Sequence, residues 1–267
     1  MSSLSFLKHL SSQLTLSPAE KAKIRLSTVA LGNRLESHFG DALRDHFVFG
    51  SFSRDTILPR WADENSDVDY MVLLDNSDNY KPQTYMNWLR TFVTNLYTRS
   101  EIYQDHPTIV LELSHIKFEL VPSYLRSAFL FFVSESIMIP ARASDYQDWQ
   151  ETDPTDFNQR LTDLNKRHKY LIKPLIRLVK YWNALNGYPF ESYSLEKDII
   201  QMSFWDCKNL RDYFYQWGNS LDYSTFQPQW VQDAISNALE LIESAEEFDD
   251  SGDTSQAERL IRSLYRY

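Results

Sequence analysis

The stretch Phe49-Gly50-Ser51, followed after fifteen residues by Asp67-Val68-Asp69, decides the fold of this chain. On a β-strand, residues i and i+2 point to the same face, so the two aspartates are neighbours. Adjacent carboxylates repel each other unless a cation lies between them, and Mg²⁺ prefers such hard oxygen ligands. The Gly50-Ser51 turn offers backbone amides and a hydroxyl to substrate phosphates. The pattern predicts a two-metal nucleotidyl-transfer site, and its alternative is a solvated Asx-rich loop.

A third carboxylate is expected from one of two alternating segments, 109–113 and 116–120. The two residues between them predict a tight β-hairpin. In that register Glu112 faces Lys117, which gives Glu112 a cross-strand ion-pair partner. Glu119 faces an apolar residue instead, so we predict it as the third metal ligand or general base. The alternative for Glu119 is a solvated strand glutamate.

These motifs together resemble the DNA polymerase β-type nucleotidyltransferase superfamily, with Phe118-Glu119-Leu120-Val121-Pro122 as the third element. The closer likeness is to the branch that holds oligoadenylate synthases, cyclic GMP-AMP synthase and bacterial enzymes of anti-phage signalling. That branch usually has Asp where this chain has Glu119. Residues 171–183 resemble the spine helix of the branch, and residues 191–196 resemble the segment that follows it.

The resemblance implies an α+β fold, with a polymerase β-like nucleotidyltransferase core (a small mixed sheet with helices) and a C-terminal helical lobe. It implies two Mg²⁺ ions, with Mn²⁺ as a substitute, held by Asp67, Asp69 and Glu119. It also implies that Ser51 and Lys180 hold the triphosphate. Ser192 would hold a phosphate, and Tyr193 would stack on the base unless it is an ordinary core aromatic.

Composition narrows the class of protein. The chain has 267 residues, of which 43% are hydrophobic, and a single cysteine, which fits a reducing cytoplasm. No apolar run reaches the roughly 20 residues that cross a bilayer, so we expect a cytoplasmic protein without a membrane partner. The net charge of −10 makes the protein a poor generic binder of duplex nucleic acid.

Positive charge is concentrated between 164 and 190, where no Asp or Glu occurs. We call the following set the basic stripe, because its spacing of three, four, four and three places it along one helix face: Lys166, Lys169, Lys173, Arg177 and Lys180. Like charges at this spacing destabilise an isolated helix, so we expect a nucleoside triphosphate or a growing oligonucleotide against the stripe. Lys173 and Arg177 are assigned to a second nucleotide, and the alternative is a solvated face. Pro174 predicts a kink or a fresh helix start.

Three segments organise the chain. Residues 1–152 are predicted as the catalytic core with an N-terminal helix, and 153–245 as a helical lobe that clamps the nucleotide. Residues 246–267 are predicted as a flexible acidic joint with a C-terminal helix and tail, because Asp, Glu, Gly and Ser dominate 246–253.

The last residue, Tyr267, offers an acceptor hydroxyl, since a phenol loses its proton more readily than an alcohol. A terminal tyrosine behind a basic helix resembles the Hailong-type nucleotidyltransferases of anti-phage defence. In that family a C-terminal tyrosine primes short single-stranded DNA, made from dATP, and the DNA restrains an effector protein. We therefore predict tyrosine-primed DNA synthesis, by Tyr267 or by Tyr265.

Three alternatives remain open at this point. The first is a synthase of cyclic or linear oligonucleotide signals from ribonucleoside triphosphates. The second is nucleotidyl transfer to an RNA end or a small acceptor. The third is a nucleotide-binding scaffold without activity, against which the presence of all three carboxylates counts.

Overall fold

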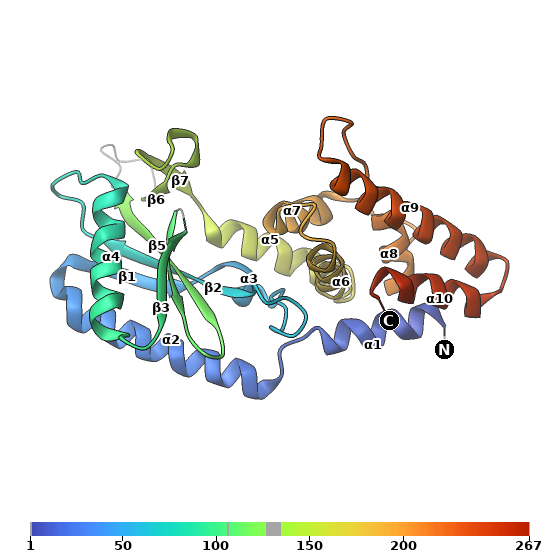
Figure 1. Cartoon of the computed structure of the whole chain (residues 1–267), viewed down its shortest axis with the longest axis horizontal. Helices are drawn as coiled ribbons and strands as arrows, with labels where there is room; N and C mark the ends of the chain where they lie inside the picture. The colour runs from blue at the N-terminus through green and yellow to red at the C-terminus, as the bar shows by residue number, and fades with distance from the viewer. Residues whose placement is uncertain (1, 106, 127–134, 267) are drawn as a thin grey trace. The chain divides into compact units, whose positions relative to one another are not determined.

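The protein is described by a computed structural model of residues 2–105, 107–126 and 135–266 (Figure 1). These residues form two compact units. The sheet unit consists of the described residues of Ser17–Ile57 and Asn65–Arg160. The helical unit consists of the described residues of Met1–Leu16, Leu58–Glu64 and Leu161–Tyr267.

A mixed sheet forms the centre of the sheet unit. Within the described residues it has seven strands, in the order β1-β2-β5-β4-β3, with β6 added to β5 and β7 to β6. The pair β2–β5 is parallel and the other pairs are antiparallel. The strands are β1 (Leu43–Val48), β2 (Asp67–Leu74), β3 (Glu101–Asp105), β4 (Thr108–Glu112), β5 (Lys117–Arg126), β6 (Ser136–Pro140) and β7 (Trp149–Thr152).

The predicted hairpin is confirmed. Strands β4 and β5 pair antiparallel with Glu112 opposite Lys117 and Val110 opposite Glu119, and the amide of Leu113 donates to the carbonyl of Ile116. Strand β2 forms because its apolar residues after the aspartates are buried on both faces of the sheet, as a central strand requires.

Helices pack against the strands of this sheet. Helix α2 (Pro18–Phe39) packs on β1, and α4 (Pro82–Leu96) packs on β3, β4 and β5 (Figure 1). Helix α2 begins with a capping box, in which Ser17 and Glu20 each accept the backbone amide of the other. The short helix α3 (Gly50–Ser53) follows β1 directly.

The helical unit is built around a single apolar core that joins both ends of the described chain. Helix α1 (Ser3–Gln13) packs on α6, α8 and α10. We predicted that the N-terminal helix belongs to the catalytic core of residues 1–152. That prediction is wrong for α1, because Phe6, Leu7 and Leu10 bury their side chains in the helical core. The other helices are α5 (Pro154–Arg167), which passes from the sheet unit into this one, α6 (Ile172–Leu185), α7 (Ser192–Gln201), α8 (Leu210–Gly218), α9 (Gln229–Asp250) and α10 (Thr254–Leu264).

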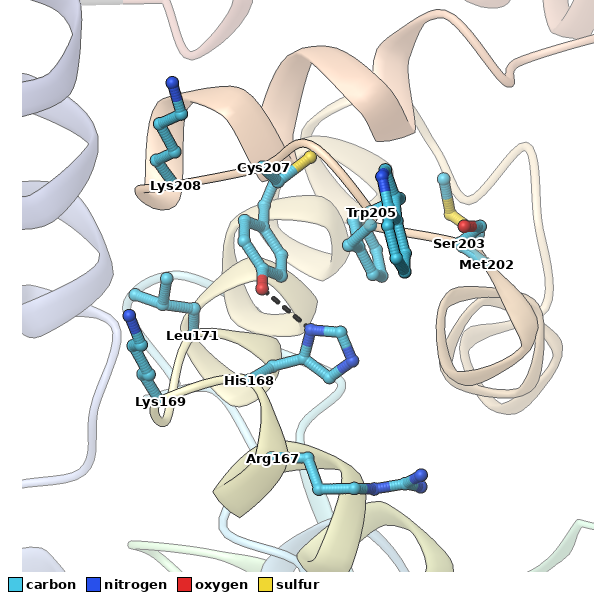
Figure 2. A pocket seen from close by; sticks show the side chains of 11 residues that line it. Arg167, His168, Lys169, Leu171, Met202, Ser203, Trp205, Cys207 and Lys208 are labelled. Carbon is cyan, nitrogen blue, oxygen red and sulfur yellow. Dashed lines mark hydrogen bonds between the residues drawn. The ribbon is translucent and has the colours of Figure 1, made fainter.

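The basic stripe does not lie along one helix, which corrects the sequence prediction. Helix α5 ends at Arg167 and α6 starts at Ile172, and Figure 2 shows the turn between them. Lys169 and Tyr170 in this turn have φ of 51° and 64°, values that a continuing α-helix does not allow. Pro174 lies in the first turn of α6, in agreement with the expected fresh helix start.

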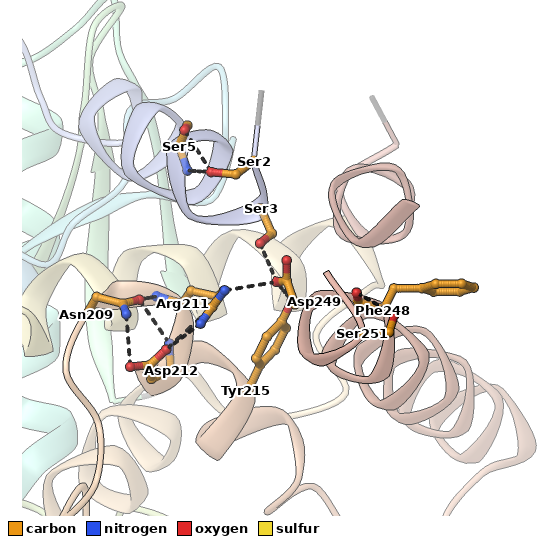
Figure 3. Close-up of polar contacts among 10 residues, drawn as sticks. All are labelled: Ser2, Ser3, Ser5, Asn209, Arg211, Asp212, Tyr215, Phe248, Asp249 and Ser251. Carbon is orange, nitrogen blue, oxygen red and sulfur yellow. Dashed lines mark hydrogen bonds and ion pairs between the residues drawn. The ribbon is translucent and has the colours of Figure 1, made fainter. Parts of the chain in front are cut away.

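The acidic segment near the chain end is helical, so the predicted flexible joint is wrong. Helix α9 continues to Asp250, and only a short turn with Gly252 at φ 89° separates it from α10. The physical reason is the carboxylate of Asp249, whose Oδ2 accepts hydrogen bonds from Ser3 Oγ at 2.5 Å and Tyr215 Oη at 2.6 Å (Figure 3). Arg211 Nη1 lies 3.5 Å from the same oxygen.

This buried polar cluster yields a stability prediction. Replacing Tyr215 by Phe removes a hydrogen bond to a buried charged group, which we expect to lower the free energy of unfolding of the helical unit by about 2 kcal/mol. The matched control is Tyr170→Phe, because Tyr170 is exposed; it should change stability by less than about 0.5 kcal/mol. Urea denaturation of both variants tests this, and equal stabilities would contradict it.

Candidate active site

The parallel pairing of β2 with β5 brings the predicted carboxylates together. In this register Asp69 lies beside Glu119, and Asp67 lies beside Lys117. Asp67, Asp69 and Glu119 are all half-buried, whereas the apolar residues between them are buried. The three acids therefore share one face at the start of two neighbouring strands.

Lys117 supplies a positive charge to this acidic face. Its Nζ lies 3.4 Å from Glu119 Oε1 and 3.8 Å from Asp67 Oδ2, and its side chain is only 12% exposed. Burial lowers the pKa of Lys117, but the charges of Asp67 and Glu119 outweigh it, so the net shift is upward. The ammonium group thus partly neutralises carboxylates that would otherwise repel each other.

Gly50 is required by the position of Asp69. A Cβ added at Gly50 would overlap the carboxylate of Asp69, and the backbone of Gly50 has φ of 68°, which other residues rarely adopt. The amide of Phe49 donates to the carbonyl of Asp69 at 3.0 Å, which fixes the turn against β2. Ser51, the next residue of the turn, is half-buried, and its carbonyl accepts the amides of Thr56 and Ile57.

The donor set fits divalent metal ions. Three carboxylates on adjacent strands are the hard oxygen ligands that Mg²⁺ prefers, and the Lys117 ammonium marks the place where positive charge is needed. Across the part of the chain that the structure describes, no three acidic, thiol or imidazole groups lie close enough to one another to hold a metal ion as they stand.

Lys180 is held by a buried ion pair in the helical unit. Its Nζ lies 3.4 Å from Glu196 Oε1, and the two side chains are 8% and 1% exposed. The sequence places no acid between 164 and 190, but α7 delivers one from outside that range. We expected a bound anion against the basic stripe. For Lys180, a carboxylate of the chain itself, Glu196, takes that place.

Ser192 and Tyr193 begin α7 after a turn fixed by Asn183. The side-chain amide of Asn183 donates to the carbonyl of Phe190 at 2.9 Å, and its oxygen accepts the Phe190 amide at 3.0 Å. Tyr193 is 47% exposed, which excludes the ordinary core aromatic that was its alternative. Lys197 Nζ lies 5.8 Å from the centre of the Tyr193 ring.

The remaining predicted residues divide into three groups. Lys173 is half-buried and Arg177 is buried, both on α6. Tyr265 is buried and stacks on Tyr181 with ring centres 5.7 Å apart, and its hydroxyl donates to the Leu178 carbonyl. Burial raises the pKa of Tyr265 well above its usual value. In this conformation its hydroxyl is therefore not available to accept the first nucleotide. Tyr267 lies outside the described residues.

Two residues at these sites escaped the sequence prediction. Lys117 was interpreted only as the partner of Glu112, although it precedes Glu119 by two residues and therefore shares its face. Glu196 lies four residues after Ser192 on the same helix, a spacing that indicates a common face. Periodicity could have identified Lys117 and Glu196 as residues of these faces. It could not have identified their ion-pair partners on other elements, Asp67 and Lys180.

The structure defines a class of protein when it is compared with solved structures. Vibrio cholerae DncV, described as a cyclic AMP-GMP synthase, superposes with a TM-score of 0.72 at 13% identity, covering 96% of this chain and 93% of that one. E. coli MS115-1 CdnC, solved with ATP, superposes with a TM-score of 0.67 at 13% identity, covering 99% and 95%. The fold is that of the polymerase β-like nucleotidyltransferases, an α+β core with a mixed sheet and a C-terminal helical lobe, as predicted.

The sequence identifies the family within that class. Residues 1–165 match the model of the Second Messenger Oligonucleotide or Dinucleotide Synthetase domain, and the chain belongs to this family. A probable cyclic nucleotide synthase of Bacillus cereus (strain VD146) is 31% identical over 144 residues. That alignment covers 51% of this chain and 42% of the relative, so it spans less than half of the relative's length. Among the described residues no helix is long and apolar enough to span a membrane.

The Gly50 contact generates a prediction about the carboxylates. Gly50→Ala should displace Asp69 by about an ångström and reduce nucleotide incorporation about a hundredfold, because catalytic groups tolerate little misplacement. It should also weaken Mn²⁺ binding measured by calorimetry. Gly40→Ala is the matched control, since Gly40 also has positive φ but a Cβ there would meet nothing within 4 Å. Equal activity of the two variants would contradict the role of Gly50.

The Lys180–Glu196 pair generates a second prediction. Glu196→Leu leaves a buried ammonium without its carboxylate and should lower the free energy of unfolding by about 3–5 kcal/mol. Adding Lys180→Met should restore most of that loss, because the buried charge is then absent. Urea denaturation measures both values. If the double variant is no more stable than Glu196→Leu alone, the loss of stability does not come from the unpaired charge of Lys180.

Proposed function

We propose that this protein is a Mg²⁺-dependent, template-independent nucleotidyltransferase that joins nucleoside triphosphates into a cyclic or linear oligonucleotide second messenger. The observation that carries the proposal is the placement of Asp67, Asp69 and Glu119 on one face of the parallel pair β2–β5, with Gly50 fitted to Asp69. Membership of a family of second-messenger synthetases supports the choice of product. By resemblance to that branch, we place the activity in anti-phage signalling.

Asp67, Asp69 and Glu119 would hold the two Mg²⁺ ions. When bound, such ions lower the pKa of the attacking hydroxyl and neutralise the leaving pyrophosphate. The chain's own part is to keep the carboxylates aligned, with the positive charge of Lys117 beside Glu119 and Asp67. In this proposal, Glu119 or Asp69 would help to remove the proton of the attacking hydroxyl.

The residues of the helical unit are proposed to bind nucleotide. By resemblance, Lys180 is assigned to the triphosphate and Ser192 to a phosphate. The same resemblance assigns Ser51, in the sheet unit, to the triphosphate. Exposed Tyr193 offers its ring to the base, since stacking grips any base without a template. Lys173 and Arg177 are assigned to the second nucleotide.

Tyrosine-primed synthesis of single-stranded DNA from dATP is the second candidate. It rests on Tyr267, which the structure does not describe. Burial of Tyr265 disfavours that residue as the primer. Family membership supports the oligonucleotide messenger more directly, so we rank it first.

The test is incubation of the protein with Mg²⁺ and each NTP or dNTP, followed by mass spectrometry of the filtrate and of the intact protein. We expect small oligonucleotides in the filtrate and an unchanged protein mass. A ladder of nucleotide masses on the protein that disappears in Tyr267→Phe would establish tyrosine priming instead and name its nucleotide.

The carboxylates are tested in the same assay. Asp67→Asn combined with Asp69→Asn should abolish product formation while leaving the fold intact. The matched control is Glu101→Gln with Asp105→Asn, because both acids are exposed on strand β3 of the same sheet. Continued synthesis by the first double variant would remove these carboxylates from the proposed site.

A further inference from the structure

A pocket of about 420 Å³ lies within the helical unit, and none of the residues proposed for nucleotidyl transfer lines it. Its walls come from the α5–α6 turn, from the segment that follows α7, and from Tyr213 of α8 (Figure 2). The volume falls within the range of about 300–1,000 Å³ that small-molecule sites occupy. The pocket is therefore large enough for a ligand of nucleotide size.

The charged residues of this pocket are all basic. Arg167, Lys169 and Lys208 line it, and no Asp or Glu does, although the protein as a whole carries a net charge of −10. All three are exposed, and within the described part of the chain none of them forms an ion pair with a carboxylate. The carboxylates of Asp206, Asp212 and Glu246 act on Cys207 from outside the lining, whereas the three cations line the pocket itself. Three cations around one pocket favour an anion with several negative charges.

An aromatic surface accompanies the positive charge. Trp205 lines the pocket with 91% of its surface exposed, so a large apolar ring is left in water. In the same lining, Phe204 and Tyr213 stack with ring centres 4.5 Å apart and an interplanar angle of 15°. An exposed tryptophan beside several cations is the combination that binds a planar base linked to phosphates.

Hydrogen bonds and backbone geometry fix the pocket in advance. His168 Nδ1 lies 2.7 Å from the hydroxyl of Tyr213, which holds the imidazole in place (Figure 2). Burial and then the charge of Arg167 lower the pKa of His168. Lys169 and Tyr170 keep left-handed backbone conformations, with the Tyr170 amide donating to the Asn165 carbonyl at 2.7 Å. Such conformations are unfavourable for these residue types and persist only where the surrounding structure imposes them.

We propose that this pocket is a second, non-catalytic nucleotide site, in which a base stacks on Trp205 and phosphates contact Lys169, Lys208 and Arg167. The site is separate in composition from the transfer residues, so it can respond to nucleotide concentration without taking part in the reaction. Two members of the basic stripe, Lys166 and Lys169, have no role in the proposed transfer chemistry, and the pocket accounts for Lys169.

The direct test follows Trp205 by ¹⁹F NMR in full-length protein labelled with 5-fluorotryptophan. The Trp205 resonance is assigned with Trp205→Phe, and ATP is added in the presence of EDTA so that no turnover occurs. We expect a saturable shift of this resonance. Adenosine alone and tripolyphosphate alone should each bind at least about tenfold more weakly, since each supplies only half of the contacts.

Charge reversal gives the second readout. Lys169→Glu with Lys208→Glu should raise the dissociation constant for ATP at Trp205 by about tenfold or more. Lys23→Glu with Arg25→Glu makes the same change in net charge on the exposed face of α2 and should leave the constant unchanged. A Trp205 resonance that does not move at millimolar ATP would overturn the proposal. Equal dissociation constants for ATP in the two double variants would also overturn it. An equal response to tripolyphosphate would also overturn it, because the base would then contribute nothing.

Discussion

The parallel pairing of β2 with β5 is the constraint on which the rest of the candidate active site depends. It sets Asp69 beside Glu119 and Asp67 beside Lys117 in a single register. A slip of one residue would turn every one of these side chains to the opposite face of the sheet. The β4–β5 hairpin and the burial of the apolar residues of β2 lock that register, and Gly50 leaves the space that Asp69 needs.

Each unit holds a lysine of low exposure in an ion pair with carboxylates. Lys117 lies between Glu119 and Asp67, and Lys180 lies against Glu196. These pairs explain how the charges are tolerated away from water, where an isolated ion would be very unfavourable. Under the proposed function, Asp67, Asp69 and Glu119 would hold Mg²⁺ in place of Lys117, and a phosphate would compete with Glu196 for Lys180. Lys180 is therefore positioned before a phosphate binds.

Local sequence patterns, such as alternation and loop length, predicted much of this structure. They did not predict the pairings between residues that are far apart in the sequence. The hairpin register of Glu112 and Lys117 came from alternation and loop length. The parallel neighbour of β2 is about fifty residues away, so its register could be inferred only from a family resemblance. The acidic end of α9 was expected to be flexible because its composition gives no sign that Asp249 is buried by partners from α1 and α8.

The central claim, that Asp67, Asp69 and Glu119 form the metal centre, is tested most directly by a crystal structure with Mn²⁺ and a non-hydrolysable nucleoside triphosphate. Anomalous scattering locates the ions independently of any model of the chemistry. We expect peaks about 2.1 Å from oxygens of all three carboxylates, with Lys117 Nζ displaced from between them. Bound nucleotide with Lys117 still paired to Glu119 and Asp67, and with anomalous peaks elsewhere or absent, would contradict it.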